Sequence, residues 1–202
     1  MSHPFLKHLI SPITLKLPSG KSVSLQRCEY RFLPWRGDPI QDTYGGKAVL
    51  DFGGKPVFAE LAILGVRRQA RWDGVWVDTY RRKFRQSLPP DCCELPARAQ
   101  GLYERIRKTN GGKSSGCFDV FAWKGTKYLF IESKRKSADA IQQTQKTWIE
   151  AALKAGVPVD ALLICEWSLE TAGYDPDLFQ SKEDVEDLRR HIEWYEKRRR
   201  GE

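Results

Sequence analysis

Two apolar segments separated by a short turn constrain this chain more than any other feature of its 202 residues. Residues 118–123 and 128–133 carry the bulky, β-branched and aromatic side chains that favour strands, and Lys124-Gly125 favours a turn. The two segments therefore predict an antiparallel β-hairpin. Because side chains alternate between the two faces of a strand, Glu132 and Lys134 should point to the same side.

The length of the turn decides whether Asp119 joins Glu132 on that face. A two-residue loop at Lys124-Gly125 would make the two acids diagonal neighbours, about 7–8 Å apart at the backbone. A four-residue loop over residues 124–127 would place them directly opposite each other. A three-residue loop would place them on opposite faces of the hairpin and separate them.

The rest of the chain predicts a mixed α/β protein. We divide it into a β-rich N-terminal extension packed on the core (1–55), a core (56–170) and a basic C-terminal helix (171–202). From residue 58 onward, leaving aside one short helix, the predicted order is helix, three strands, helix, strand. The predicted elements are a hairpin over 13–25, a helix over 58–68, a strand over 74–80, a short helix over 97–108, the hairpin 118–133, a helix over 138–154, a strand over 159–167 and a helix over 184–199.

Charge and cysteine content narrow the class of protein. The chain carries 34 Lys and Arg against 26 Asp and Glu, a formal charge of +8 that attracts polyanions such as nucleic acids. Many basic proteins bind no nucleic acid, so the charge alone is compatible with either class. Five irregularly spaced cysteines without a CxxC pair argue against a disulfide scaffold and against a structural zinc site.

The apolar runs of the chain are short. The N-terminus has no segment of signal-peptide length, and no run approaches the length of a membrane span. We therefore expect a protein with no membrane partner, located in the cytoplasm or associated with the nucleoid.

Two carboxylates that converge at the end of an apolar hairpin repel each other and lose solvation, so they need a cation. Mg²⁺ suits Asp119 and Glu132 because it prefers hard oxygen ligands, and Mn²⁺ should substitute for it. An adjacent Lys134 could hold a water molecule or a phosphate oxygen. Acid-x-Lys triplets also occur on ordinary surface hairpins, but here Phe130-Ile131 places the acid at the end of a buried run.

These residues resemble a known motif. Phe118-Asp119, followed by residues 130–134, resembles the D…(D/E)xK motif of the PD-(D/E)XK nuclease superfamily, with Phe118 in place of the usual Pro or Gly. An acid at Asp139, then Gln145 and Trp148, resembles the VRR-NUC (virus-type replication-repair nuclease) branch. The resemblance covers about residues 105–167. It implies a restriction-endonuclease-like core with a β-rich N-terminal addition and a C-terminal helix.

The resemblance also implies roles for individual residues. Its family carries an acid on the preceding helix, for which Glu60 is the candidate and Asp73 and Asp78 are rivals. Gln145 shares a helical face with Trp148, and a buried amide there would need hydrogen-bond partners. The residues alone are equally compatible with a Gln145 that lies at the edge of that face and meets water, and the resemblance favours the site. The other assigned residues are Asp119, Glu132 and the Ser133 carbonyl as metal ligands, and Lys134 as the catalytic lysine.

Basic residues interleaved with aromatic ones suit contact with phosphates and bases. Gly112-Lys113-Ser114 lacks the glycine that a phosphate-binding P-loop needs five positions earlier, so we interpret it only as a basic loop. The candidate nucleic-acid-binding residues are Arg67, Arg68, Arg71, Arg81, Arg82, Lys83 and Lys113.

We therefore expect a Mg²⁺-dependent nuclease, an endonuclease that cuts DNA. By resemblance, it would act on branched or junction DNA and work as a homodimer. Two alternatives remain: an inactive nucleic-acid-binding module of the same fold, and a sequence-specific, restriction-like endonuclease.

Overall fold

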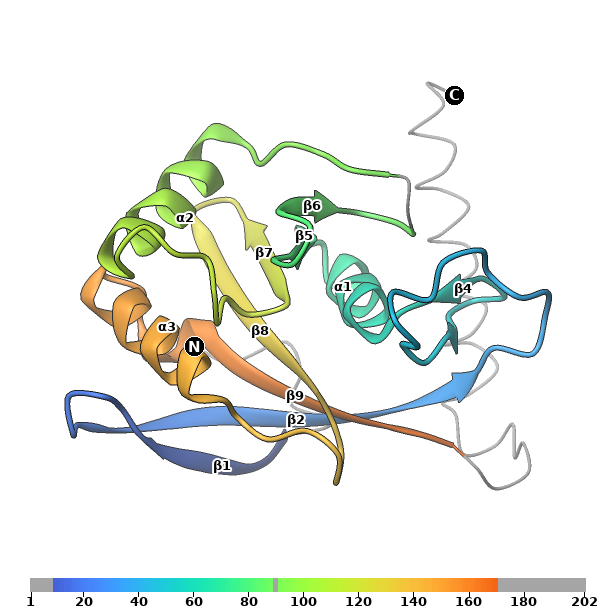
Figure 1. Ribbon diagram of the computed structural model, residues 1–202, viewed down its shortest axis with the longest axis horizontal. Helices are drawn as coiled ribbons and strands as arrows, with labels where there is room; N and C mark the ends of the chain where they lie inside the picture. Colours follow the sequence, from blue (N-terminus) through green and yellow to red (C-terminus); the bar gives the residue numbers. More distant parts are fainter. Residues whose placement is uncertain (1–8, 89–90, 171–202) are drawn as a thin grey trace.

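Strands β7 (Val120–Lys124) and β8 (Lys127–Arg135) form the predicted hairpin. The hairpin lies inside a nine-stranded mixed sheet (Figure 1). The computed structural model describes residues 9–88 and 91–170. Within them the strand order is β4-β3-β2-β9-β8-β7-β5-β6, and β1 pairs with β2. The remaining strands are β1 (Leu9–Lys16), β2 (Ser22–Pro34), β3 (Leu50–Asp51), β4 (Pro56–Val57), β5 (Asp73–Asp78), β6 (Lys83–Arg85) and β9 (Leu162–Leu169).

The hairpin turn sits one residue later than the predicted Lys124-Gly125 loop. Lys124 pairs with Lys127, which leaves Gly125 and Thr126 as the turn, and Gly125 has the positive φ of 60° that such turns favour. Val120 is paired with Ile131. The next residues away from the turn, Asp119 and Glu132, are therefore opposite each other. This is the strand register that we expected from a four-residue loop over residues 124–127.

In the described part of the chain, three helices cover the sheet, in one layer on each of its faces. Helix α1 (Ala59–Gln69) packs on one face, against apolar side chains that include Trp76 and Ile131. Helices α2 (Ala97–Thr109) and α3 (Gln143–Lys154) pack together on the other face, against Phe121 and Phe130 (Figure 1). The alternation along β7 and β8 thus fills both cores, and a 3-10 turn (Val159–Ala161) leads into β9.

The N-terminal segment, predicted as a β-rich extension packed on the core (1–55), contributes a strand to the central sheet itself. Strand β2 pairs in parallel with β9 from Gln26↔Leu163 to Phe32↔Leu169, so it belongs to the central sheet. β1 and β2 do form the predicted antiparallel hairpin. Parallel pairing between segments so far apart in sequence leaves no local signal, which explains the difference.

Two further elements differ from the sequence predictions. Helix α3 begins at Gln143, five residues after the predicted start, because Gln142 is extended and forms a capping box with Gln145. Strand β6 was not predicted, and it pairs with the end of β5 through Asp78↔Lys83.

The predicted C-terminal helix, residues 184–199, lies outside the described residues. None of the helices in the described part of the chain is long and apolar enough to cross a bilayer.

Gly116 allows the segment before β7 to approach helix α3 closely. Its φ is +79°, and a Cβ atom there would lie 2.1 Å from the Thr144 carbonyl oxygen. Only glycine fits this combination of left-handed backbone and close approach. The contact fixes the first turn of α3, which carries Gln145 and so reaches Glu132.

Gly116→Ala should therefore destabilise the protein far more than Gly112→Ala. Gly112 has nearly the same φ, +78°, but a Cβ atom added there would meet no atom within 4 Å, so it controls for backbone strain alone. We expect a loss of about 1–2 kcal/mol for Gly112→Ala and about 3–5 kcal/mol for Gly116→Ala in denaturant unfolding. Equal losses would mean that the contact with Thr144 does not constrain the fold.

Candidate active site

The sheet register brings Asp119 to the end of β8. Asp119 directly precedes β7, and its Oδ2 accepts a hydrogen bond from the Ser133 N–H at 2.9 Å. Its carbonyl oxygen accepts one from the Val77 N–H at 2.7 Å. Neighbouring strands on both sides thus fix the backbone and the carboxylate of Asp119.

Glu132 is the most deeply buried acid of the site, with 2% of its surface exposed. Its Oε1 accepts hydrogen bonds from the Gln145 amide and from Lys134 Nζ, the latter at 3.0 Å. Its Oε2 is buried and has no hydrogen-bond partner among the described residues. Burial and the charge of Asp119 raise the pKa of Glu132 well above its usual value, although Lys134 acts in the opposite direction.

Gln145 links helix α3 to the acidic pair. Its Oε1 accepts the Gln142 N–H at 2.8 Å and so closes the capping box, while its Nε2 donates to Glu132. The side chain therefore caps the helix and restrains the carboxylate at the same time. The structure brings together four of the residues assigned from sequence: Asp119, Glu132, Lys134 and Gln145.

Glu60, in the first turn of α1, reaches the site from the opposite layer. It is buried, with 6% exposure, and its charge acts on Asp119. Its Oε2 has no hydrogen-bond partner among the described residues. A carboxylate at a helix N-terminus is also stabilised by the helix dipole.

The two rival acids have other surroundings. Asp73 pairs with Trp123 at the far end of β5, away from Asp119. Asp78 lies at the near end, but its oxygens accept the Arg81 N–H at 3.1 Å and Arg85 Nε at 3.0 Å. Glu60 is therefore the helix acid that the geometry favours.

Lys47 is a site residue that the sequence did not reveal. It lies on the loop between β2 and β3, its ammonium forms an ion pair with Glu60, and it stands 5.3 Å from the centre of the Trp76 ring. Burial tends to lower the pKa of Lys47, but the charges of Glu60, Asp119 and Asp78 raise it above its usual value. No periodicity or motif marks an isolated loop lysine as part of a site.

Like charges and burial make the site costly without a cation. Burial first, and then the charge of Glu60, raise the pKa of Asp119 to about 6, although the Ser133 N–H and the two lysines oppose this. When all groups are ionised, three carboxylates face two ammonium groups, which leaves one negative charge. A cation would relieve this repulsion.

The donor set fits Mg²⁺. Carboxylate oxygens are its preferred ligands, and the free Oε2 atoms of Glu60 and Glu132 are buried acceptors without a hydrogen bond in the described chain. No three His, Cys, Asp or Glu side chains between residues 9 and 170, apart from 89 and 90, converge as a ready metal cluster. Mg²⁺ needs only one or two carboxylates, completed by water and phosphate oxygens, so the pair Asp119–Glu132 is sufficient.

Arg67 is not a nucleic-acid contact, contrary to the sequence prediction. It is fully buried on α1 at 0% exposure, near Tyr30, Cys28 and Cys165 of β2 and β9. Burial lowers the pKa of Arg67 to about 10. Its position in a basic run looked like a solvated face, but this side of the helix packs on the sheet.

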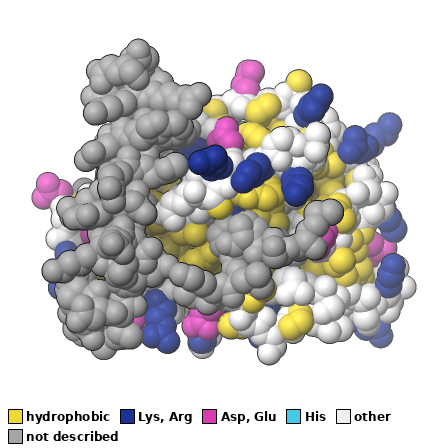
Figure 2. Space-filling model, turned by 180° about the vertical axis from the view of Figure 1, so that it is seen from behind, with side chains coloured by type: hydrophobic (Ala, Val, Ile, Leu, Met, Phe, Trp, Pro, Cys, Tyr) yellow, Lys and Arg dark blue, Asp and Glu magenta, His cyan; other side chains and the backbone are white. Residues whose placement is uncertain are grey.

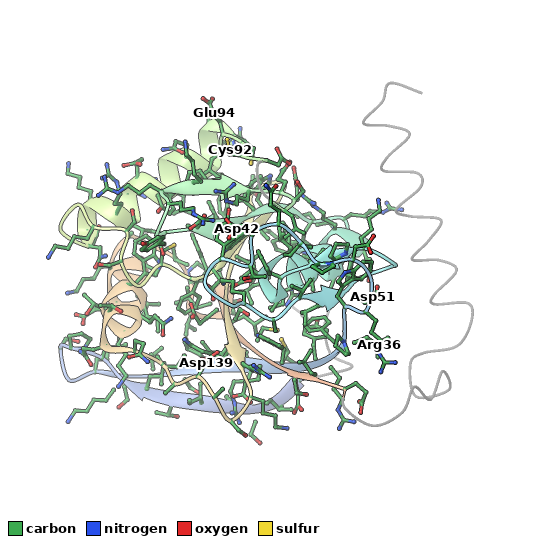
Figure 3. The ribbon with its side chains drawn as sticks, turned by 45° about the vertical axis from the view of Figure 1, so that its right-hand side comes forward. Arg36, Asp42, Asp51, Cys92, Glu94 and Asp139 are labelled. Atoms are coloured by element: carbon green, nitrogen blue, oxygen red, sulfur yellow. The ribbon has the colours of Figure 1, made fainter. Side chains whose placement is uncertain are left out.

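The other predicted cations divide into two groups. Arg68 donates to the carbonyl oxygens of Gln86 and Gly74, at 3.2 and 3.4 Å, and so braces β5. Arg81 stacks 3.3 Å from the centre of the Tyr44 ring and pairs at 3.0 Å with Asp42. Asp42 lies on the β2–β3 loop (Figure 3). The exposed remainder are Arg71, Arg82, Lys83 and Lys113.

One face of the molecule carries several separate basic side chains. On the described part of the face in Figure 2, Lys and Arg lie dispersed among hydrophobic side chains.

A scan of protein-family models and searches of curated proteins and of solved structures find no match for this chain. Its function is therefore inferred from the chemistry of the site and from the motif resemblance.

Asp119→Asn should stabilise the metal-free protein at pH 8, and much less at pH 5. Because the pKa of Asp119 is raised in the folded protein, ionisation of this group lowers the free energy of unfolding of the wild type as the pH rises from about 4 through 6. This loss remains at higher pH. Asparagine cannot ionise, yet its oxygen can still accept the Ser133 N–H. The measurement is thermal unfolding in EDTA at both pH values.

Asp73→Asn is the matched control, because Asp73 also accepts a backbone N–H, from Gly74 at 2.7 Å, but lies outside the acidic cluster. It should show no such gain. Added Mg²⁺ should then raise the melting temperature of the wild type at pH 8 but not that of Asp119→Asn. A variant less stable than the wild type at pH 8 would contradict the assigned electrostatics.

Proposed function

We propose that this protein is a metal-dependent nuclease that hydrolyses DNA phosphodiester bonds on a core of the PD-(D/E)XK type. One observation carries the proposal: Asp119, Glu132 and Lys134 share one end of a sheet, with Glu60 and Gln145 supplied by the helices on its two faces. The order of the elements and the D…ExK spacing support the same conclusion.

The acids and the lysine have different proposed roles in hydrolysis. Asp119, Glu132 and the Ser133 carbonyl would hold Mg²⁺, or Mn²⁺ in its place, and Glu60 is a further candidate ligand. The bound ion would supply a nucleophile by lowering the pKa of a water molecule. Lys134, at 3.0 Å from Glu132 Oε1, is placed to orient that water or to neutralise charge developing on the phosphate. Gln145 holds Glu132 in position.

The substrate is read through its backbone. The exposed cations Arg71, Arg82, Lys83 and Lys113 suit sequence-independent phosphate contacts. The motif resemblance adds branched or junction DNA and action as a homodimer to the proposal. An inactive binding module is disfavoured because every acid of the site, and Lys134, is present.

Glu132→Gln should reduce cleavage by at least about 1,000-fold, since it removes a metal ligand and about 4 kcal/mol of barrier lowering. Asp73→Asn, an acid on the same sheet but away from the site, should cut like the wild type. The assay compares junction, flap and linear DNA with Mg²⁺ and with EDTA. Cleavage by Glu132→Gln at the wild-type rate, or cleavage in EDTA, would refute the proposed function.

Lys83→Ala should weaken DNA binding and flatten its salt dependence by roughly 0.9 in the log–log slope, the value for one phosphate contact. Lys83 is exposed and pairs with Asp78 at the site end of β5. Lys127→Ala is the control, because Lys127 also begins a strand and is exposed but lies at the turn end of the hairpin. Binding is measured without Mg²⁺; equal slopes for both variants would place the DNA elsewhere.

A further inference from the structure

Lys47 brings a second ammonium group to the acidic site, and the fold places it there. The Lys47 N–H donates to the Thr43 carbonyl at 2.8 Å, and the neighbouring Tyr44 packs against Phe58 and Trp76 with ring centroids 5.6 and 5.4 Å away. The loop that carries Lys47 is thus anchored to the core.

The ammonium is held on several sides. It pairs with one oxygen of Glu60, Oε1, and faces the ring of Trp76 at 5.3 Å, a distance at which a cation is attracted to the ring. The charges of Asp119 and Asp78 also act on it. The other oxygen of Glu60, Oε2, stays buried without a hydrogen bond within the described chain. Glu60 can therefore bridge Lys47 on one side and a bound ion on the other.

The charges around the site limit how many ions it takes. Its three carboxylates and two lysines sum to one negative charge, so one divalent ion leaves one positive charge, which matches a single phosphodiester. A second divalent ion would raise the net charge to three positive charges, and it would have to approach Glu60 beside the Lys47 ammonium. Repulsion between cations at such short range in a partly buried site is strong.

We propose, on the basis of the proposed function, that the site holds a single divalent ion and that Lys47 takes the place of a second one beside Glu60. Lys47 is then a positioning residue: it keeps one oxygen of Glu60 occupied and leaves the other for the ion. Two-metal nucleases use a second ion to clamp the phosphate, and here an ammonium from the chain supplies that charge.

The test counts Mn²⁺ ions bound to the full chain without DNA, by calorimetry and by electron paramagnetic resonance. The wild type should bind one ion with the spectrum of an isolated Mn²⁺. Lys47→Met frees Glu60 and should bind two ions with a spin-coupled spectrum, whereas Lys47→Arg should still bind one. Lys136→Met is the matched control, because Lys136 also pairs with a single glutamate, Glu29, at 2.7 Å but outside the site.

Two ions in the wild type, or one ion in a folded Lys47→Met variant, would overturn the inference and leave the proposed function intact. No Mn²⁺ bound to the wild type would refute both. If Lys47→Met fails to fold, the spectrum of the wild type alone decides, since a coupled pair and an isolated ion differ without any mutation.

Discussion

The pairing of Val120 with Ile131 is the constraint on which the site depends. It sets Asp119 across from Glu132 at the point where β7 begins, and a shift by one residue would turn one acid to the other face. The Ser133 N–H then fastens the Asp119 carboxylate to β8. The same pairing brings two carboxylates together where little solvent reaches them, so the fold carries an electrostatic cost that a metal cation would offset.

The layers on both sides of the sheet converge on this pair. The first turn of α1 supplies Glu60 and the first turn of α3 supplies Gln145, so the two helix starts meet at one end of the hairpin. Gly116 permits the close approach of α3, and the β2–β3 loop adds Lys47. The site is thus assembled from five separate parts of the chain, while its central acids come from one local hairpin.

The contrast between a local hairpin and contacts from distant segments explains which parts of the site the sequence could predict. Strand alternation, a local rule, placed Glu132 and Lys134 on one face, while the place of Asp119 depended on the loop length. Gln145 was assigned from the motif resemblance, with its position on a helical face as separate support. The place of β2 beside β9, and of Lys47 beside Glu60, depends on contacts between distant segments, which no local pattern encodes. Arg67 was misjudged because a basic run is usually solvated, and here one of its members is buried.

The location of the metal tests the central claim most directly. Crystals soaked in Mn²⁺ give an anomalous diffraction signal that places the ion without reference to any assay. We predict a peak about 2.0–2.3 Å from carboxylate oxygens of Asp119 and Glu132 and near the Ser133 carbonyl. A peak at other acids, such as Asp78 or Asp139, with none at Asp119 and Glu132, would contradict the account.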